Sequence, residues 1–450
     1  MIAIVMASFT VLTGVPCFPA EHQHWGAAGR YTHIGAGTHG GSIMDNGWII
    51  LIGGVIVLLL IVPAGAVPTT GPALTANVTY AGTPASVQFT DTSGIADVVS
   101  RSWSFGDGTR QETSGTGERS VVHTYPDPGS YNVTLSIATR TSVVTTTATV
   151  ETFARQQAIS VGDPSGTDGL AVSFNATHLP GMRPDFTDIR FVDTEAIPIP
   201  YWAENVSEGA YARVWLALPA KTPAITMLYG NPEAGSASDP DAVFLFFEDY
   251  EVGDLSRWSF SGSNGRIQSD VVRGGAYAGD LSVSEPDLPE FGSNRVCLAN
   301  ISAGPLVIEG DFRVSEFGRW CGSGYIQAWN GTNHLYALHL RNGSVQHYDG
   351  EHRNFSADAR ARTDTWYHIK VVLDTPRATE HAWMDGEYLG SAPMRFADGS
   401  LVSSETIFDD FALIGSSSWY SGDPHHFYAD NIIVRKYVLI EPVLSYGGGS

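Results

Sequence analysis

The stretches WSFGDGT (residues 103–109) and HTYPDPGSYNVTLSI (residues 123–137) decide the fold that the sequence predicts. In 103–105 and 131–137 apolar and polar residues alternate, as side chains do along a strand that buries one face. Asp107-Gly108 supplies the positive φ angles that a tight hairpin turn requires. These stretches therefore predict antiparallel strands joined by short turns.

The same alternation extends over residues 71–152, through Ser86–Phe89 and the Thr-rich run Val144–Val150. This part resembles the PKD domain, an immunoglobulin-like sandwich. The residues that carry the resemblance are Trp103, Phe105-Gly106-Asp107-Gly108, His123-Thr124-Tyr125, Pro128-Gly129 and Tyr131-Asn132-Val133. The resemblance implies a spacer or a binding module without catalytic residues, and we interpret Asp107 as a turn residue.

A second unit is predicted over residues 153–243, where apolar alternation recurs between Pro and Gly breaks. It resembles a domain of unknown function from archaeal and bacterial surface proteins. The matching residues are Asp188-Ile189-Arg190-Phe191, Trp202, Val214-Trp215 and Tyr229-Gly230-Asn231-Pro232. The resemblance implies a surface location and no established activity.

The third and largest unit covers residues 244–446. Tyr367, Ile369, Val371 and Leu373 share one strand face, and Asp385-Gly386 marks a hairpin turn. The pattern resembles the concanavalin A-like lectin and glucanase jelly roll in its laminin-G-like form. The predicted fold class is thus all-β: an immunoglobulin-like sandwich, a small β domain and a jelly-roll sandwich, preceded by one transmembrane helix.

That helix is predicted over Trp48–Val67, WIILIGGVIVLLLIVPAGAV, twenty uncharged residues that can cross a hydrocarbon layer of about 30 Å. The alternative is a secretory signal cut at Ala64-Gly65-Ala66. We favour the anchor because the run is long and lacks a basic leader. Both interpretations export residues 68–450. Residues 1–47 are interpreted as a disordered leader, or as sequence upstream of a start at Met44.

Composition agrees with export. The net charge is −22 and only three residues are lysine, so a nucleic acid is not an expected partner. Eight of the fourteen asparagines head an N-x-S/T triplet, and all eight follow the apolar segment. We predict N-glycosylation at Asn77, Asn132, Asn175, Asn205, Asn300, Asn330, Asn342 and Asn354.

Cys297 and Cys321 are the only cysteines after the apolar segment. A disulfide between them would suit an oxidising exterior and would contribute about 3 kcal/mol by loop entropy. The alternative is a pair of buried free thiols.

Two kinds of binding site are predicted in the third unit. Aromatic side chains could stack on sugar rings, with a place in the core of the sandwich as the alternative for each: Trp320, Trp329, Tyr336, Trp419 and Tyr420. A structural Ca²⁺ could bind between the unit's first and last strands, with surface carboxylates as the alternative: Glu248, Asp249, Asp430 and Asn431. No other cofactor is expected.

An enzyme is not predicted. Glu309 and Asp311 lie two residues apart on one strand, about 7 Å from each other, which is a spacing compatible with glycosidases. The glucanases of the resembled fold carry a third acid further along that strand, and Val314 occupies its place.

The sequence therefore predicts a non-catalytic, glycosylated, archaeal-type protein of the cell membrane with extracellular β domains, serving adhesion or envelope structure. Its expected partners are surface glycans or other envelope proteins, besides the membrane. Two alternatives stay open: a secreted or anchored glycoside hydrolase, and a structural subunit of an envelope layer or filament.

Overall fold

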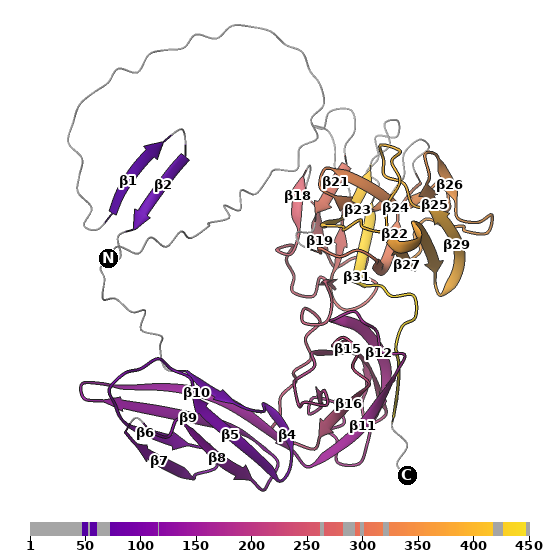
Figure 1. The fold of residues 1–450 in the computed structure, drawn as a ribbon. Helices are drawn as coiled ribbons and strands as arrows, with labels where there is room; N and C mark the ends of the chain where they lie inside the picture. Colours follow the sequence, from indigo (N-terminus) through magenta and orange to yellow (C-terminus); the bar gives the residue numbers. More distant parts are fainter. Residues whose placement is uncertain are drawn as a thin grey trace.

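A computed structural model describes residues 47–52, 55–60, 73–115, 117–261, 265–281, 293–297, 301–317, 324–416 and 426–446. Within them the chain is built from strands, with a single 3-10 turn at Thr375–Arg377 and no α-helix. Three β units follow one another. The first and second lie side by side, and the third lies above the second (Figure 1). The all-β prediction is confirmed.

The apolar segment differs from its prediction. Its described residues form two antiparallel strands, β1 (Gly47–Ile52) and β2 (Val55–Leu60), with Trp48 opposite Leu59. In the described part of the chain no helix is long and apolar enough to span a membrane. The run is rich in Ile and Val, whose branched side chains favour strands over helices. Residues 61–67 lie outside the described residues, and the choice between anchor and signal stays a prediction.

The first unit is a sandwich of two sheets, with strand orders β4-β10-β9-β6-β7 and β3-β5-β8. Phe89, Trp103 and Tyr125 are fully buried between them. The strands are β3 Leu74–Ala76, β4 Tyr80–Gly82, β5 Ala85–Asp91, β6 Val98–Ser104, β7 Arg110–Ser114, β8 Ser120–Tyr125, β9 Gly129–Thr139 and β10 Val143–Phe153.

A turn follows β6 as predicted, but its positive φ angles belong to Gly106 and Gly108 and not to the pair Asp107-Gly108. Asp107 Oδ1 accepts a hydrogen bond from the backbone N–H of Thr109 at 2.9 Å, and Gly106 and Gly108 have φ values of 87° and 90°. The other carboxylate oxygen of Asp107 lies 2.7 Å from Nε2 of His123. The role of Asp107 as a turn residue is therefore confirmed.

The second unit pairs a sheet of order β13-β16-β11-β32 with a sheet of order β12-β15-β14. Most of it is contiguous: β11 Arg155–Gly162, β12 Leu170–Thr177, β13 Arg190–Val192, β14 Tyr201–Ser207, β15 Tyr211–Leu218 and β16 Ala224–Tyr229. The exception is β32 (Val443–Tyr446), which returns after the third unit and pairs with β11, Ile159 opposite Tyr446. The predicted boundary of the third unit at residue 446 is therefore wrong, because these four residues belong to the second unit.

The third unit is a larger β-sandwich. Its first sheet has the order β19-β20-β31-β22-β27-β28-β29, with β17 also pairing β31, and its second has the order β18-β21-β30-β23-β24-β25-β26. The strands are β17 Phe246–Glu248, β18 Ser259–Ser261, β19 Arg266–Gln268, β20 Ala278–Asp280, β21 Ser293–Cys297, β22 Leu306–Val314, β23 Gly324–Asn330, β24 Asn333–Arg341, β25 Ser344–Tyr348, β26 His352–Asn354, β27 Tyr367–Asp374, β28 Thr379–Met384, β29 Glu387–Pro393, β30 Asp410–Ser416 and β31 Phe427–Lys436.

The strand patterns predicted in the third unit are present. Ile369, Val371 and Leu373 of β27 are fully buried in the core between the two sheets, and Tyr367 packs against that core. Asp385 and Gly386 form the turn between β28 and β29 with φ values of 50° and 84°. The first observation confirms the predicted buried face of β27, and the second confirms the predicted hairpin.

Candidate functional site

The second sheet of the third unit carries ring side chains on the face that points away from the core. Ile326 and Ala328 of β23 belong to the core, so the alternating Tyr325, Gln327 and Trp329 lie on the opposite face. On the neighbouring β24, Tyr336 and His339 occupy that same face although they are three positions apart. A register shift between Ile326 and Gln327 makes this possible.

Seven rings contact one another here and form what we call the outer aromatic cluster: Tyr325, Trp329, His334, Tyr336, His339, Tyr348 and His352. Trp329 stacks on His334 with ring centroids 4.5 Å apart. Tyr336 stands at the centre, 4.7 Å from both His334 and His339. His339 in turn lies 4.5 Å from His352 of β26. The cluster thus spans four paired strand segments, β23 to β26.

Two histidines of this cluster, His339 and His352, have lowered pKa values, which favours their uncharged form. Burial holds the pKa of His339 well below its usual value, and the neighbouring His352 and Arg341 lower that pKa further. Burial and Arg341 also lower the pKa of His352. His339 is fully buried, and neither of its ring nitrogens has a hydrogen-bond partner among the described residues.

Amide side chains accompany the rings. Nε1 of Trp329 donates to Oε1 of Gln327 at 3.0 Å, and Nε2 of Gln346 donates to Oδ1 of Asn354 at 2.9 Å. Flat rings next to amides and hydroxyls provide both an apolar surface and hydrogen-bonding groups. This combination suits a ligand that has apolar faces and hydroxyl edges.

The structure brings together two of the five residues predicted to bind carbohydrate, Trp329 and Tyr336. The other three lie outside the described residues: Trp320, Trp419 and Tyr420. The remaining five members of the cluster were not predicted from the sequence. For Tyr325 the signal was available, because it alternates with Trp329 on the same strand.

The predicted calcium ligands do meet across paired strands, since Glu248 on β17 lies opposite Ile432 on β31. Their oxygens, however, already have protein donors. Glu248 accepts from the backbone N–H of Tyr250 at 2.8 Å and from Nε1 of Trp258 at 3.0 Å. Asp430 accepts from the backbone N–H groups of Arg273 and Gly274.

The other two predicted ligands are also engaged. Asp249 accepts from the backbone N–H of Glu251 at 3.1 Å, and Asn431 donates to Asp311 at 3.0 Å. In the described ranges no group of three or more His, Cys, Asp or Glu residues is placed to hold a metal ion. The structure therefore does not gather these residues into one metal site, and a structural Ca²⁺ stays a prediction.

Glu309 and Asp311 of β22 are ion-paired on the outer face of the first sheet. Glu309 lies 3.1 Å from Nε of Arg435. Asp311 lies 3.3 Å from Nδ1 of His368, and this contact, above all its hydrogen bond, raises the pKa of His368. Absence of hydrolase activity stays a prediction.

The modification sites are placed in part. Seven of the eight predicted glycosylation asparagines are described, and all seven are exposed; Asn300 lies outside the described residues. Cys297 falls on β21 and Cys321 lies outside the described residues, so the disulfide stays a prediction.

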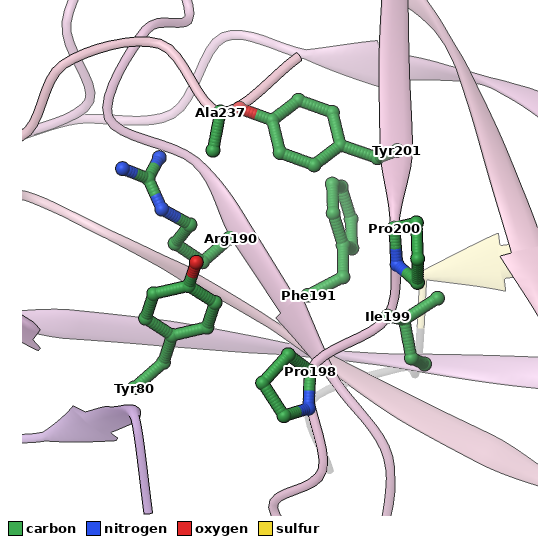
Figure 2. A pocket seen from close by; sticks show the side chains of 8 residues that line it. All are labelled: Tyr80, Arg190, Phe191, Pro198, Ile199, Pro200, Tyr201 and Ala237. Carbon is green, nitrogen blue, oxygen red and sulfur yellow. The ribbon is translucent and has the colours of Figure 1, made fainter. Parts of the chain in front are cut away.

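A cavity of about 170 Å³ lies where the first unit meets the second (Figure 2). Arg190 is its one charged lining residue, and each of its three guanidinium nitrogens lies beside a protein oxygen. Nε is 2.8 Å from Glu151, Nη1 donates to the carbonyl of Ile189, and Nη2 donates to that of Gly235. The other lining residues are Tyr80, Phe191, Pro198, Ile199, Pro200, Tyr201 and Ala237. The cavity therefore offers a ligand little charge.

Two family models match the chain. Residues 66–154 match the PKD domain, and residues 185–261 match a domain of unknown function named DUF2341. The PKD resemblance is thereby confirmed. For the second unit the match confirms a domain of unknown function, which overlaps the predicted range of 153–243 and extends to residue 261. The surface-protein origin of that domain stays a prediction. Comparison with curated proteins gives no match.

Among solved structures, a cellulose-induced protein is 14% identical, with a TM-score of 0.31 over 43% of this chain and 97% of its own. A structure described by the promiscuous specificity of carbohydrate-binding modules of the β-sandwich superfamily is 10% identical, with a TM-score of 0.23 over 82% of this chain and 98% of its own. Lectin I from Ulex europaeus, complexed with a methyl glycoside of α-L-fucose, is 12% identical, with a TM-score of 0.27 over 42% of this chain and 95% of its own. Scores this low assign neither a fold nor a ligand.

Proposed function

We propose that this chain is a non-catalytic, glycosylated cell-surface protein of archaeal type whose third unit, a concanavalin A-like jelly roll, binds carbohydrate. The observation that carries the proposal is the outer aromatic cluster. Its rings contact one another across four neighbouring strands, and the half-buried Trp329 and Tyr336 are the ones that could pack on sugar rings.

The chemistry of the cluster supports a sugar better than a charged ligand. The C–H faces of a pyranose ring pack on Trp and Tyr, and its hydroxyl groups need donors and acceptors at the edge. Burial and Arg341 lower the pKa of the exposed His352, which keeps its imidazole neutral, so that it can both donate and accept a hydrogen bond.

Surface display is supported by other features. The seven described sequon asparagines are exposed, as glycan attachment requires. Residues 48–67 would act as the anchor, or as a signal segment that leaves the β units secreted. On this basis the protein serves adhesion or envelope structure, with surface glycans or other envelope proteins as partners.

The test is glycan binding by the purified full chain, first on an array of neutral and acidic oligosaccharides and then by calorimetry. Trp329→Ala and Tyr336→Ala should each weaken binding about 30-fold, because removing a central ring costs about 2 kcal/mol. The matched control is Trp383→Ala, which removes a half-buried Trp from β28 in the other sheet. Unchanged affinity in both cluster variants, or no glycan bound by the wild-type chain, would refute the proposal.

A further inference from the structure

We call the residues that carry the resemblance of the second unit its signature residues, and two of them, Asp188 and Asn231, are buried and hydrogen-bonded. Asp188 is fully buried; its two carboxylate oxygens accept from the backbone N–H groups of Arg183 at 3.0 Å and Gly230 at 2.8 Å. Asn231 is also fully buried and accepts from the backbone N–H groups of Glu233 and Ala234. These bonds fix the segment before β13 and the turn after β16 in one place.

One side of this fixed region contacts the first unit. Arg190 reaches Glu151 of β10, and its guanidinium lies 5.4 Å from the ring centre of Tyr80 (Figure 2). Phe153, at the end of β10, shares an apolar cluster with Val192, Leu228 and Ala234. Glu233, held by the Asn231 turn, accepts from the backbone N–H of Ser130 at 3.1 Å.

The opposite side contacts the third unit through two other signature residues. Trp202 lies 4.9 Å from Phe247 and 5.6 Å from Phe244, and Trp215 lies 5.3 Å from Phe244, all between ring centroids. Arg435 of β31 lies over the Trp215 ring at 5.4 Å while it pairs with Glu309. The junction therefore joins β14 and β15 of the second unit to β17 and β31 of the third.

The chain passes between the second and third units a second time, after β31, and adds further contacts between them. After β31 the chain turns back, and Nζ of Lys436 donates to the carbonyl of Asp168. The chain then adds β32 to the sheet of the second unit, where the hydroxyl of Tyr446 accepts from the backbone N–H of Thr177 at 2.7 Å. The second and third units are therefore joined both at Phe244–Phe247 and at the end of β31.

We propose that the second unit is a rigid coupler: its signature residues hold the PKD domain on one side and the third unit on the other, so that the three units keep one relative orientation. Its partners are its own neighbours in the chain. Arg190 serves this contact and not a ligand in the adjoining cavity, because its nitrogens are already beside protein oxygens. This inference goes beyond carbohydrate binding and does not depend on it.

The test measures distances between units by spin-label spectroscopy on the full chain. Labels are introduced as unnatural amino acids at exposed positions of the three units: Gln111, Glu208 and Glu387. A rigid coupler gives narrow distance distributions for both the 111–208 and the 208–387 pairs. Units on a flexible linker would give broad distributions, since relative motion is the default for domains without a large apolar interface.

Variants separate the two junctions. Arg190→Met should widen the 111–208 distribution about twofold and leave the 208–387 distribution unchanged, and Trp202→Ala should do the reverse. Arg183→Met is the matched control for the first, because Arg183 is partly exposed and pairs with Asp185 inside its own unit. Trp383→Ala is the control for the second.

Broad distributions in the wild-type chain would overturn the proposal, and so would unchanged widths in both junction variants. The distance across the unmutated junction reports whether each variant is folded. Glycan binding is measured on the same samples. Arg190→Met and Trp202→Ala should not change it, because neither residue belongs to the outer aromatic cluster, so failure of one proposal can be told from failure of the other.

Discussion

Glu248 shows at the residue scale how burial changes the chemistry that a sequence suggests. Burial raises its pKa from about 4.5 to about 7. The folded protein therefore keeps a proton that the unfolded chain releases above pH 4.5. The resulting stability is fully present below pH 4.5 and is lost as the pH rises through 7, by about 3 kcal/mol in total.

Glu248→Gln should flatten the dependence of unfolding free energy on pH between 5 and 8, measured by urea denaturation. Part of the slope should remain, because burial also raises the pKa of Asp430, to about 6, with the same sign. Glu208→Gln, at an exposed position, should keep the wild-type slope. A Glu248→Gln profile as steep as that of the wild type would contradict the assignment.

At the element scale, β32 is an edge strand that completes a sheet begun almost 300 residues earlier in the chain. Deleting residues 443–450 should expose the edge of β11 and speed amide hydrogen exchange at residues 159–162 about tenfold, or about 1.4 kcal/mol of local stability. Exchange in β22, which lies in the third unit, should not change. Deletion of 447–450 alone is the control, and equal exchange in both truncated chains would mean that β32 contributes nothing.

Individual strands could be predicted because alternation reports which face of a strand is buried. This succeeded for β27 and for the hairpin at Asp385-Gly386, where local pattern and turn chemistry agree. It could not place β32, because a four-residue strand with alternate half-buried positions has no unique partner in the sequence. Nor could it place His339 beside Tyr336, since the register shift breaks the two-residue period.

Contacts between the three β units were the least predictable feature of the molecule. The sequence marked Arg190, Trp202 and Trp215 as a family pattern, but the pattern does not say which neighbour each side chain meets. Buried aromatic contacts between units look, in sequence, like those inside a core. For the candidate site the same limit applies: Trp329 and Tyr336 could be named, while the surface they form depends on how four strands are ordered.

The topology of the whole molecule gives the last prediction. If residues 68–450 lie outside the cell, protease added to intact cells should remove the three β units and leave at most a small membrane fragment. The sequons and both cysteines able to pair lie on that side of the apolar segment. No later stretch approaches the ~20 apolar residues needed to cross back; the longest candidate, Ala242–Phe247, ends at Glu248. A cleaved signal would instead place the β units in the medium. If they were protected until the cells were lysed, export would be wrong, and the adhesion proposal would fail with it.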